Sequence, residues 1–330
     1  MTHTASSPLE RLHALVREDL DQTNRIILEK LNAQVQLIPT LGSHLIKSGG
    51  KRLRPTLTLV SARMFGYSGD RHALLAAVIE FIHTATLLHD DVVDHSKTRR
   101  GVETANSVWG DKAPVLVGDF LFSRSFQILV EHADLDALRS VADACAIISE
   151  GEVLQLVVSN DLATDEAKYI EVVTHKTASL FSCAAELGAI LCRRPPADRQ
   201  AVADYGLMLG IAYQLVDDAL DYSARQETFG KSVGDDFHEG KMTLPVIHAY
   251  AHGNEAERQF WCQTLEQGAQ PPGSLEQAID LVRKRGSLEY AMNRAREYAA
   301  RAKSALAPLP DSPHKQALEQ LADFSVDREY

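Results

Sequence analysis

The sequence contains few cysteines, and the four that are present lie far apart, at Cys145, Cys183, Cys192 and Cys262. No two of them form a CxxC pair, so neither a zinc ribbon nor a thioredoxin-like redox site is predicted. Only 19 glycines and 12 prolines occur in 330 residues, which excludes collagen-like and mucin-like chains. Scattered thiols are typical of a reducing cytosol. We therefore predict a cytoplasmic protein.

Positive charge is also in deficit, because 34 Lys and Arg residues face 45 Asp and Glu residues and leave a net charge of −11. This balance disfavours a nucleic-acid-binding protein with a strong basic field. Hydrophobic residues make up 45% of the chain, which is enough to bury a core and excludes disorder as the dominant state. An acidic protein that handles anionic substrates has to concentrate its cations locally or recruit metal ions.

Long hydrophobic runs are absent as well. The best uncharged apolar run, residues 205–216, is too short to span a membrane. Residues 1–12 have neither a basic n-region nor an apolar h-region, so no secretory signal is predicted.

What the sequence does contain is the helical period, because apolar residues recur at spacings of three and four along most of the chain. Glycine, proline and asparagine breakers separate about ten helices. Segments 177–191 and 205–216 are apolar on nearly all sides, which is typical of helices at the centre of a bundle. No composition shift or repeat marks a second domain. We predict an all-α fold in which residues 1–330 form a single domain.

The most informative feature is a cluster of acidic residues, Asp90, Asp91 and Asp94, directly after an apolar segment. Positions 90 and 94 are one helical turn apart and share a face, with position 91 at its margin. Like charges at this spacing destabilise a helix. The cost falls if a cation lies between the carboxylates.

A second acidic cluster has the same spacing and also follows an apolar segment. It consists of Asp217, Asp218 and Asp221. Either cluster alone is equally consistent with a solvated helix end, but the repetition argues against that interpretation. Carboxylates with open coordination positions suit Mg²⁺, which retains waters and prefers phosphate oxygens. Six carboxylates facing one another across a cavity predict several Mg²⁺ ions and a multiply charged phosphate ligand.

Basic residues accompany both clusters. The stretch GGKRLRP at 49–55 lacks the GKS or GKT ending of a Walker A loop, and in isolation it is typical of a basic helix-entry loop. Arginine can bind phosphate with two hydrogen bonds, and lysine supplies a compact charge. The candidate phosphate-binding bases are Lys51, Arg54, Arg99, Arg100, Lys176, Lys231 and Lys241. Together the motifs predict a pocket in which acids hold metal and bases hold phosphate.

His83 lies seven residues before Asp90, close to the same helix face. A lone histidine on an apolar helix is more often a hydrogen-bonded core residue. A phosphate contact becomes a competitive interpretation only because Asp90 shares the face. A zinc site formed by His83 and His89 is disfavoured, because their spacing places them on different faces, and His89 stays unassigned.

With these motifs in view, the sequence resembles the trans-isoprenyl diphosphate synthases over nearly its whole length. It is most similar to the long-chain bacterial branch, the octaprenyl to decaprenyl synthases that make quinone side chains. The motifs that carry the resemblance are GGKRLRP at 49–55, DDVVD at 90–94, RRG at 99–101, GD at 118–119, KT at 176–177, DDALD at 217–221, KS at 231–232 and GK at 240–241.

The resemblance implies a homodimer of all-α, single-domain bundles, each with about ten or more helices around a deep central cavity. The implied reaction is successive 1′–4 head-to-tail condensation of isopentenyl diphosphate onto an allylic diphosphate, with farnesyl diphosphate as the primer. Implied roles follow for individual residues. Three Mg²⁺ ions would be held by Asp90 and Asp94 and by Asp217 with Asp221, with Asp91 and Asp218 nearby. Isopentenyl diphosphate would bind Lys51, Arg54, His83 and Arg100. The allylic diphosphate would bind Arg99, Lys176, Lys231 and Lys241, and the reacting carbons would face Thr177 and Gln214.

Product length depends on what lies one helical turn before Asp90. Ala85 and Thr86 occupy this position and both are small, whereas a Phe or Tyr at either would form a floor under the growing tail. We therefore predict a product longer than geranylgeranyl diphosphate. The alternative interpretation is that both are simply tight helix-packing residues.

Other interpretations remain open. One is a synthase of shorter products, farnesyl or geranylgeranyl diphosphate. Another is a non-catalytic partner subunit of a heteromeric synthase, although such subunits typically lose aspartates and this chain keeps all six. A terpene cyclase fits less well, because it lacks the second DDxxD and the GGKRLRP element. A long prenyl product cannot pass freely into water, which predicts transient membrane contact during its release.

Overall fold

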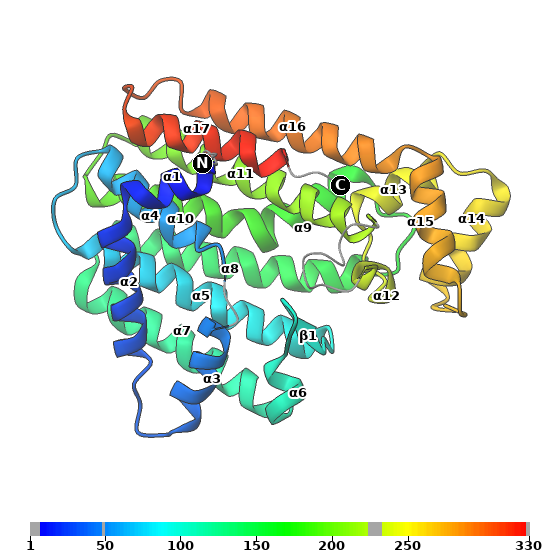
Figure 1. The fold of residues 1–330 in the computed structure, drawn as a ribbon, viewed down its shortest axis with the longest axis horizontal. Coiled ribbons are helices and arrows are strands. Elements are labelled where there is room, and N and C mark those ends of the chain that lie inside the picture. The colour runs from blue at the N-terminus through cyan, green and yellow to red at the C-terminus, as the bar shows by residue number, and fades with distance from the viewer. Residues whose placement is uncertain (1–6, 48–49, 224–232, 328–330) are drawn as a thin grey trace, which may run out of the picture. The chain divides into compact units, whose positions relative to one another are not determined.

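The structure is a computed structural model that describes residues 7–47, 50–223 and 233–327. Within these ranges the chain forms seventeen α-helices, two π-helical turns and one short hairpin (Figure 1). The predicted all-α fold is thereby confirmed.

Contacts divide the chain into two compact units. The first comprises Met1–Cys145, Leu180–Gly206 and Lys303–Leu321, and the second comprises Ala146–Ser179, Leu207–Ala302 and Ala322–Tyr330. Several helices contribute residues to both units. The single domain predicted from the sequence stays a prediction.

Most of the described elements begin in the first unit. In chain order, the elements that begin there are α1 (Pro8–Leu15), α2 (Arg17–Lys30), α3 (Leu37–Lys47), α4 (Leu53–Met64), α5 (Arg71–Val93), β1 (Thr98–Arg99), β2 (Val102–Glu103), α6 (Ala105–Trp109), α7 (Lys112–His132), α8 (Leu135–Val158), α11 (Pro196–Asp221) and α17 (Pro313–Val326). Residues Leu180–Leu191 of α10 (Ser179–Leu191) also belong to this unit.

Helix α5 is the core of the first unit and packs against α7, α4 and α2. It lies beside α7 in Figure 1. The two helices approach closely at Gly118, where an added Cβ would lie 2.2 Å from Nε2 of His89. That ring nitrogen is 3.1 Å from the carbonyl oxygen of Val115. His89, which the sequence left unassigned, therefore joins the end of α5 to α7.

A second close approach joins α4 to α10. A Cβ on Gly188 would lie 2.3 Å from the backbone nitrogen of Ala62, so only glycine fits there. The Thr58 hydroxyl donates to the carbonyl oxygen of Ala184 across the same interface, at 2.8 Å. Small residues thus allow two buried helices to pack almost backbone to backbone.

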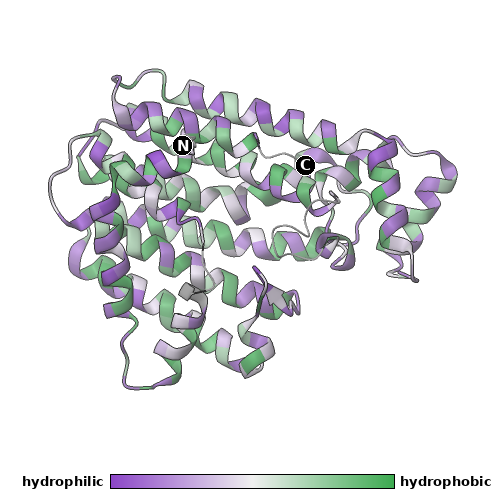
Figure 2. Cartoon of the chain, in the orientation of Figure 1, coloured by the Kyte–Doolittle hydropathy of each residue, from purple (hydrophilic) through white to green (hydrophobic). Residues whose placement is uncertain are grey.

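The second unit contains the remaining elements. They are α9 (Glu166–Val173), the π-helical turn η1 (Thr174–Ala178), α12 (Asp235–His238), α13 (Leu244–Ala251), α14 (Glu255–Trp261), the π-helical turn η3 (Cys262–Glu266), α15 (Ser274–Lys284) and α16 (Ser287–Ala305). Figure 2 shows hydrophilic and hydrophobic residues alternating along α16. Its buried residues recur every three or four positions, as expected of a helix with one face on the core.

Among the described residues, two helices, α5 and α7, have the length and the apolar composition of a membrane-spanning helix. The core helix of a soluble protein has the same two properties, and 67% of the apolar window of α5 is buried inside the protein. For α7 the buried share is 39%. Length and composition are therefore weak evidence for a span.

Candidate active site

The first acidic cluster lies at the C-terminal end of α5. Asp90 and Asp91 are in its last turn and Asp94 is its C-cap residue, with no basic residue in that turn. The C-terminal end of a helix carries the negative pole of the macrodipole and favours cations. Three carboxylates at this pole are thus disfavoured by the helix dipole as well as by one another. This arrangement favours a cation bound between the carboxylates.

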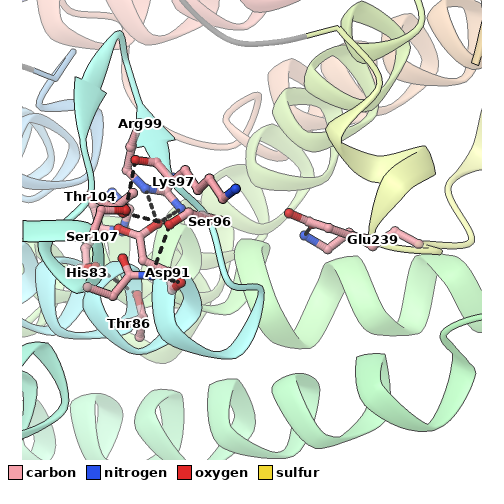
Figure 3. Close-up of polar contacts among 11 residues, drawn as sticks. His83, Thr86, Asp91, Ser96, Lys97, Arg99, Thr104, Ser107 and Glu239 are labelled. Carbon is pink, nitrogen blue, oxygen red and sulfur yellow. Dashed lines mark hydrogen bonds and ion pairs between the residues drawn. The ribbon is translucent and has the colours of Figure 1, made fainter. Parts of the chain in front are cut away.

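Asp91 differs from its two neighbours because it is wholly buried. Its Oδ1 accepts hydrogen bonds from Nε of Arg99 at 2.8 Å and from Nη2 at 2.7 Å (Figure 3). Burial raises the pKa of Asp91 despite the opposing arginine charge. Asp90 and Asp94 are only half-buried. The structure therefore separates Asp91, which holds Arg99, from the Asp90–Asp94 pair.

The segment after α5 folds back as the hairpin β1–β2 and is fastened by side chains that follow it. The Thr104 hydroxyl donates to the carbonyl oxygen of Ser96 at 2.7 Å, and Ser107 donates to that of Lys97 at 3.2 Å (Figure 3). Asn106 donates to the carbonyl oxygens of Asp91 and Ser96, both at 3.0 Å. These bonds fix the position of Arg99 on β1.

Three of the predicted diphosphate-binding residues come together in the first unit. Nη1 of Arg54 lies 3.1 Å from Nε2 of His83, and the guanidinium of Arg100 lies against Gly50. Burial, followed by the charges of Arg54 and Arg100, holds the pKa of His83 well below its usual range. His83 is therefore neutral, with Nε2 accepting from Arg54 and Nδ1 carrying the proton. Lys51, also predicted here, is exposed.

The basic loop has a buried partner that no sequence motif marked. Arg52 immediately precedes α4 with a φ of 48°, and its guanidinium forms an ion pair with Glu80 of α5. Glu80 is buried. A lone glutamate in the apolar segment 73–82 was the available signal, because a buried carboxylate requires a partner.

The second acidic cluster, Asp217, Asp218 and Asp221, occupies the last turn of α11, which also lacks a basic residue. Asp218 is buried, and burial followed by the charge of Asp236 raises its pKa to about 7. Asp221 is buried too and accepts from the backbone nitrogen of Asp236 at 3.1 Å. Asp217 is half-buried. Both clusters thus share the same placement at a helix C-terminus.

Lys176 and Thr177 lie in the π-helical turn η1, a type of turn that is frequent at functional sites. Helix α8 approaches this turn closely, because a Cβ on Gly151 would lie 2.6 Å from the backbone nitrogen of Lys176. Glu152 forms an ion pair with Nζ of Lys176 at 2.6 Å. Glu152, which no sequence motif marked, directly follows this glycine.

A cavity of about 110 Å³ in the second unit brings most of its predicted site residues together. It is lined by Gln155, Val158, Ser159, Tyr169, Val172, Val173, Lys176, Thr177, Gln214, Asp218, Asp236, Lys241, Met242 and Thr243. Lys241 forms an ion pair with Glu239, which is labelled in Figure 3. Lys231, the remaining predicted base, lies outside the described residues.

The donor set determines which metal could bind. Among the described residues, no three histidine, cysteine or acidic side chains are grouped so as to hold one ion. Mg²⁺ is usually bound by one or two carboxylates together with waters and substrate phosphates. Pairs of carboxylates one turn apart, at 90 and 94 and at 217 and 221, fit a cation that binds together with a diphosphate.

The two predicted chain-length positions have different surroundings. Ala85 is wholly buried, whereas Thr86 is half-buried. The Thr86 hydroxyl donates to the carbonyl oxygen of His83 at 2.8 Å (Figure 3). Thr86 is therefore the position where a larger side chain meets less packing resistance.

Comparison with known proteins gives consistent matches. A family profile described as polyprenyl synthetase matches residues 35–282. The chain is 46% identical to the octaprenyl diphosphate synthase of Escherichia coli K12, over 97% of this chain and 99% of the relative. It superposes with a TM-score of 0.93 on a decaprenyl diphosphate synthase from Rhodobacter capsulatus, at 49% identity and with 97% and 100% of the two chains covered.

A further match is a polyprenyl synthase from Caulobacter crescentus CB15 that was crystallised with calcium and isoprenyl diphosphate. Its TM-score is 0.95 at 46% identity, with 98% of this chain and 99% of that chain covered. In that protein a divalent cation accompanies an isoprenyl diphosphate.

Proposed function

The chain belongs to the polyprenyl synthetase family, and from that premise we propose that it is a long-chain all-trans polyprenyl diphosphate synthase. It is a prenyltransferase whose substrates are isoprenyl diphosphates and whose chemistry depends on a divalent metal ion. The observation that carries the proposal is the placement of two carboxylate pairs at the C-terminal ends of two helices, α5 and α11. Nothing in the helices themselves favours negative charge there.

The residues that would hold Mg²⁺ are Asp90 with Asp94 and Asp217 with Asp221, and together they would bind three ions. When bound, Mg²⁺ neutralises the diphosphate oxygens and makes pyrophosphate a better leaving group. Asp91 is kept apart from these ligands, because its side chain is wholly buried and its Oδ1 binds Arg99. The placement of Asp91 supports a role in orienting that arginine.

Binding of isopentenyl diphosphate is assigned to Lys51, Arg54, His83 and Arg100. Because His83 is neutral with Nδ1 protonated, it donates a hydrogen bond without adding positive charge. Arg54 is already oriented by His83 and by the Phe181 ring, whose centroid is 4.3 Å from the guanidinium carbon. A pre-oriented guanidinium loses less conformational freedom when it binds phosphate.

Binding of the allylic diphosphate is assigned to Arg99, Lys176, Lys231 and Lys241. The ion pair with Glu152 holds Lys176 in place before the substrate arrives. Departure of pyrophosphate leaves positive charge on the allylic carbon, and the oxygen atoms of Thr177 and Gln214 can stabilise it without reacting. The double bond of isopentenyl diphosphate then attacks this carbon, and the departed pyrophosphate accepts the proton that is lost.

We further propose farnesyl diphosphate as the primer and a product of octaprenyl to decaprenyl length that serves as a quinone side chain. Incubation with farnesyl diphosphate, labelled isopentenyl diphosphate and Mg²⁺, followed by reversed-phase sizing of the dephosphorylated products, tests this. We expect a ladder that ends at eight to ten isoprene units and disappears when a chelator is added. A ladder that stops at four units would identify a shorter-chain synthase, and no incorporation from any primer would favour a partner subunit.

A homodimer is proposed as well. Helix α7 presents Val115, Leu116 and Val130 to solvent, and the last two are 67% and 74% exposed. Large apolar side chains on one exposed helix are typical of a protein interface. Light scattering of the purified protein should give about twice the 36.3 kDa chain mass, and a monomeric mass would contradict the dimer. The transient membrane contact predicted from the product stays a prediction.

A further inference from the structure

Four side chains of the second unit form a continuous chain of hydrogen bonds in the 110 Å³ cavity. The Tyr169 hydroxyl donates to Oδ2 of Asp218 at 2.6 Å. Nε2 of Gln214 donates to Oδ1 of the same carboxylate at 2.7 Å. The Thr177 hydroxyl donates to Oε1 of Gln214 at 3.1 Å. Tyr169, which no motif had singled out, is thus linked to Gln214 and Thr177 through Asp218.

This chain determines which way the Gln214 amide points. Both oxygens of Asp218 act as acceptors, one for Tyr169 and one for Gln214. The Gln214 amide therefore directs its N–H group toward Asp218. Its oxygen then lies toward Thr177 and accepts the hydrogen bond that the threonine hydroxyl donates. The oxygen and nitrogen of a glutamine amide are nearly equal in size, so packing alone does not prevent the reverse orientation.

The orientation matters for the proposed chemistry. With the amide in this orientation, the negative ends of two dipoles, the Gln214 carbonyl and the Thr177 oxygen, are available to developing positive charge. The reverse orientation would present an N–H group instead. Fixed dipoles contribute most when they need no reorganisation during the reaction. Any group that locks the amide therefore contributes to the rate without touching the substrate.

We propose that Tyr169 is a positioning residue that, by bonding Asp218, locks the Gln214 amide with its oxygen directed toward the reacting allylic carbon. This inference rests on the proposed function. Tyr169 and Asp218 are each only 4% exposed, so water does not readily replace the tyrosine hydroxyl. Without that bond Asp218 has a free acceptor oxygen and can rotate, and the amide loses its fixed anchor.

A double-mutant cycle tests the coupling. Tyr169→Phe removes a single oxygen, and we expect kcat to fall by about tenfold while the KM values for both substrates stay within about twofold. The Mg²⁺ concentration for half-maximal activity should not change. In a Gln214→Met background, where no amide remains to be oriented, Tyr169→Phe should change kcat by less than about twofold.

Tyr205→Phe is the matched control. Tyr205 is fully buried and its hydroxyl donates to the carbonyl oxygen of Leu318 at 2.7 Å, so the same oxygen is removed from an equally buried hydrogen bond. We expect both phenylalanine variants to lower the thermal midpoint comparably, but only Tyr169→Phe to lower kcat. The thermal midpoint also verifies that each variant is folded.

Three results would overturn the inference: an unchanged kcat for Tyr169→Phe, an equal loss in the wild-type and Gln214→Met backgrounds, or a raised Mg²⁺ requirement. Failure of the proposed function looks different. In that case the wild-type protein itself would not extend any allylic primer.

Discussion

Replacing Asp90 with asparagine is expected to lower kcat/KM for chain extension by about 10³-fold or more while slightly stabilising the folded protein. The loss of activity follows from the removal of one of the two carboxylates on α5 that we propose as cation ligands. The gain in stability, about 0.3–1 kcal/mol without metal, follows because the last turn of a helix disfavours negative charge. Extension assays and chemical denaturation in the presence of a chelator measure the two quantities.

A loss of activity combined with a gain in stability distinguishes a metal-binding carboxylate from a carboxylate that only lies at a helix end. A carboxylate on a merely solvated helix end would give the small stability gain and no loss of activity. The Mg²⁺ concentration for half-maximal activity should also rise for Asp90→Asn, since a ligand is missing. Activity within about tenfold of wild type at saturating Mg²⁺ would contradict the assigned role.

Asp327→Asn provides a matched control. Asp327 is exposed and directly follows the last residue of α17, so the substitution removes the same charge from the end of another helix. We expect a comparable small change in stability and wild-type activity. A large activity loss in this control would show that the assay responds to something other than the aspartate clusters.

Much of the fold could be predicted because its determinants are local. The apolar stripe at Leu74, Val78, Ile82, Ala85 and Leu88 follows the helical period, and the structure places all five on α5. The hairpin β1–β2 could not be predicted, because its strands have two residues each and show no alternation. Nor could the π-helical turn η1, which lies where α8 packs closely against the chain at Gly151.

In the candidate site, too, features set by local spacing could be predicted and features set by tertiary packing could not. Two carboxylates one turn apart can be recognised from spacing alone, as at Asp90 and Asp94. The partner of a buried side chain cannot, because the chain has to fold before the two meet. Tyr169 and Asp218 are 49 positions apart, and their hydrogen bond depends on the packing of α9 against α11. Asp91 and Arg99 are only 8 positions apart but meet because the chain turns back between the end of α5 and β1.

The Arg52–Glu80 pair illustrates why such residues escape sequence motifs. Arg52 lies within the basic stretch GGKRLRP, yet its side chain binds Glu80, 28 positions away. The motif identifies a basic loop, but only the tertiary structure shows that Arg52 is the base paired with a buried carboxylate. Glu80 is buried on α5 and forms an ion pair with the residue that immediately precedes α4.

Replacing Thr86 with phenylalanine is expected to shorten the product from a long polyprenyl chain to about four isoprene units or fewer. Thr86 lies one turn before Asp90, about 6 Å along the helix from the carboxylate that we propose anchors the diphosphate through a metal ion. A phenylalanine ring at this half-buried position would block the path of the tail, whereas threonine leaves it open. Reversed-phase sizing of the dephosphorylated products measures the change.

Ala85→Phe gives a second, distinguishable result. Ala85 is wholly buried, so the ring has to displace packed neighbours at a cost of about 1–3 kcal/mol. We expect a shorter product here too, accompanied by a lower thermal midpoint, whereas Thr86→Phe should shorten the product with a smaller loss of stability. The difference between the two variants follows from their burial and not from their distance to Asp90.

Thr86→Val is the control, because it keeps the shape of the side chain and removes only the hydroxyl that donates to the His83 carbonyl oxygen. Its product should keep the wild-type length. If Thr86→Phe and Ala85→Phe both remain active and make full-length product, the tail does not pass this face of α5. The reaction assigned to the aspartate clusters would stand, but the floor that limits the product would have to be formed by other residues.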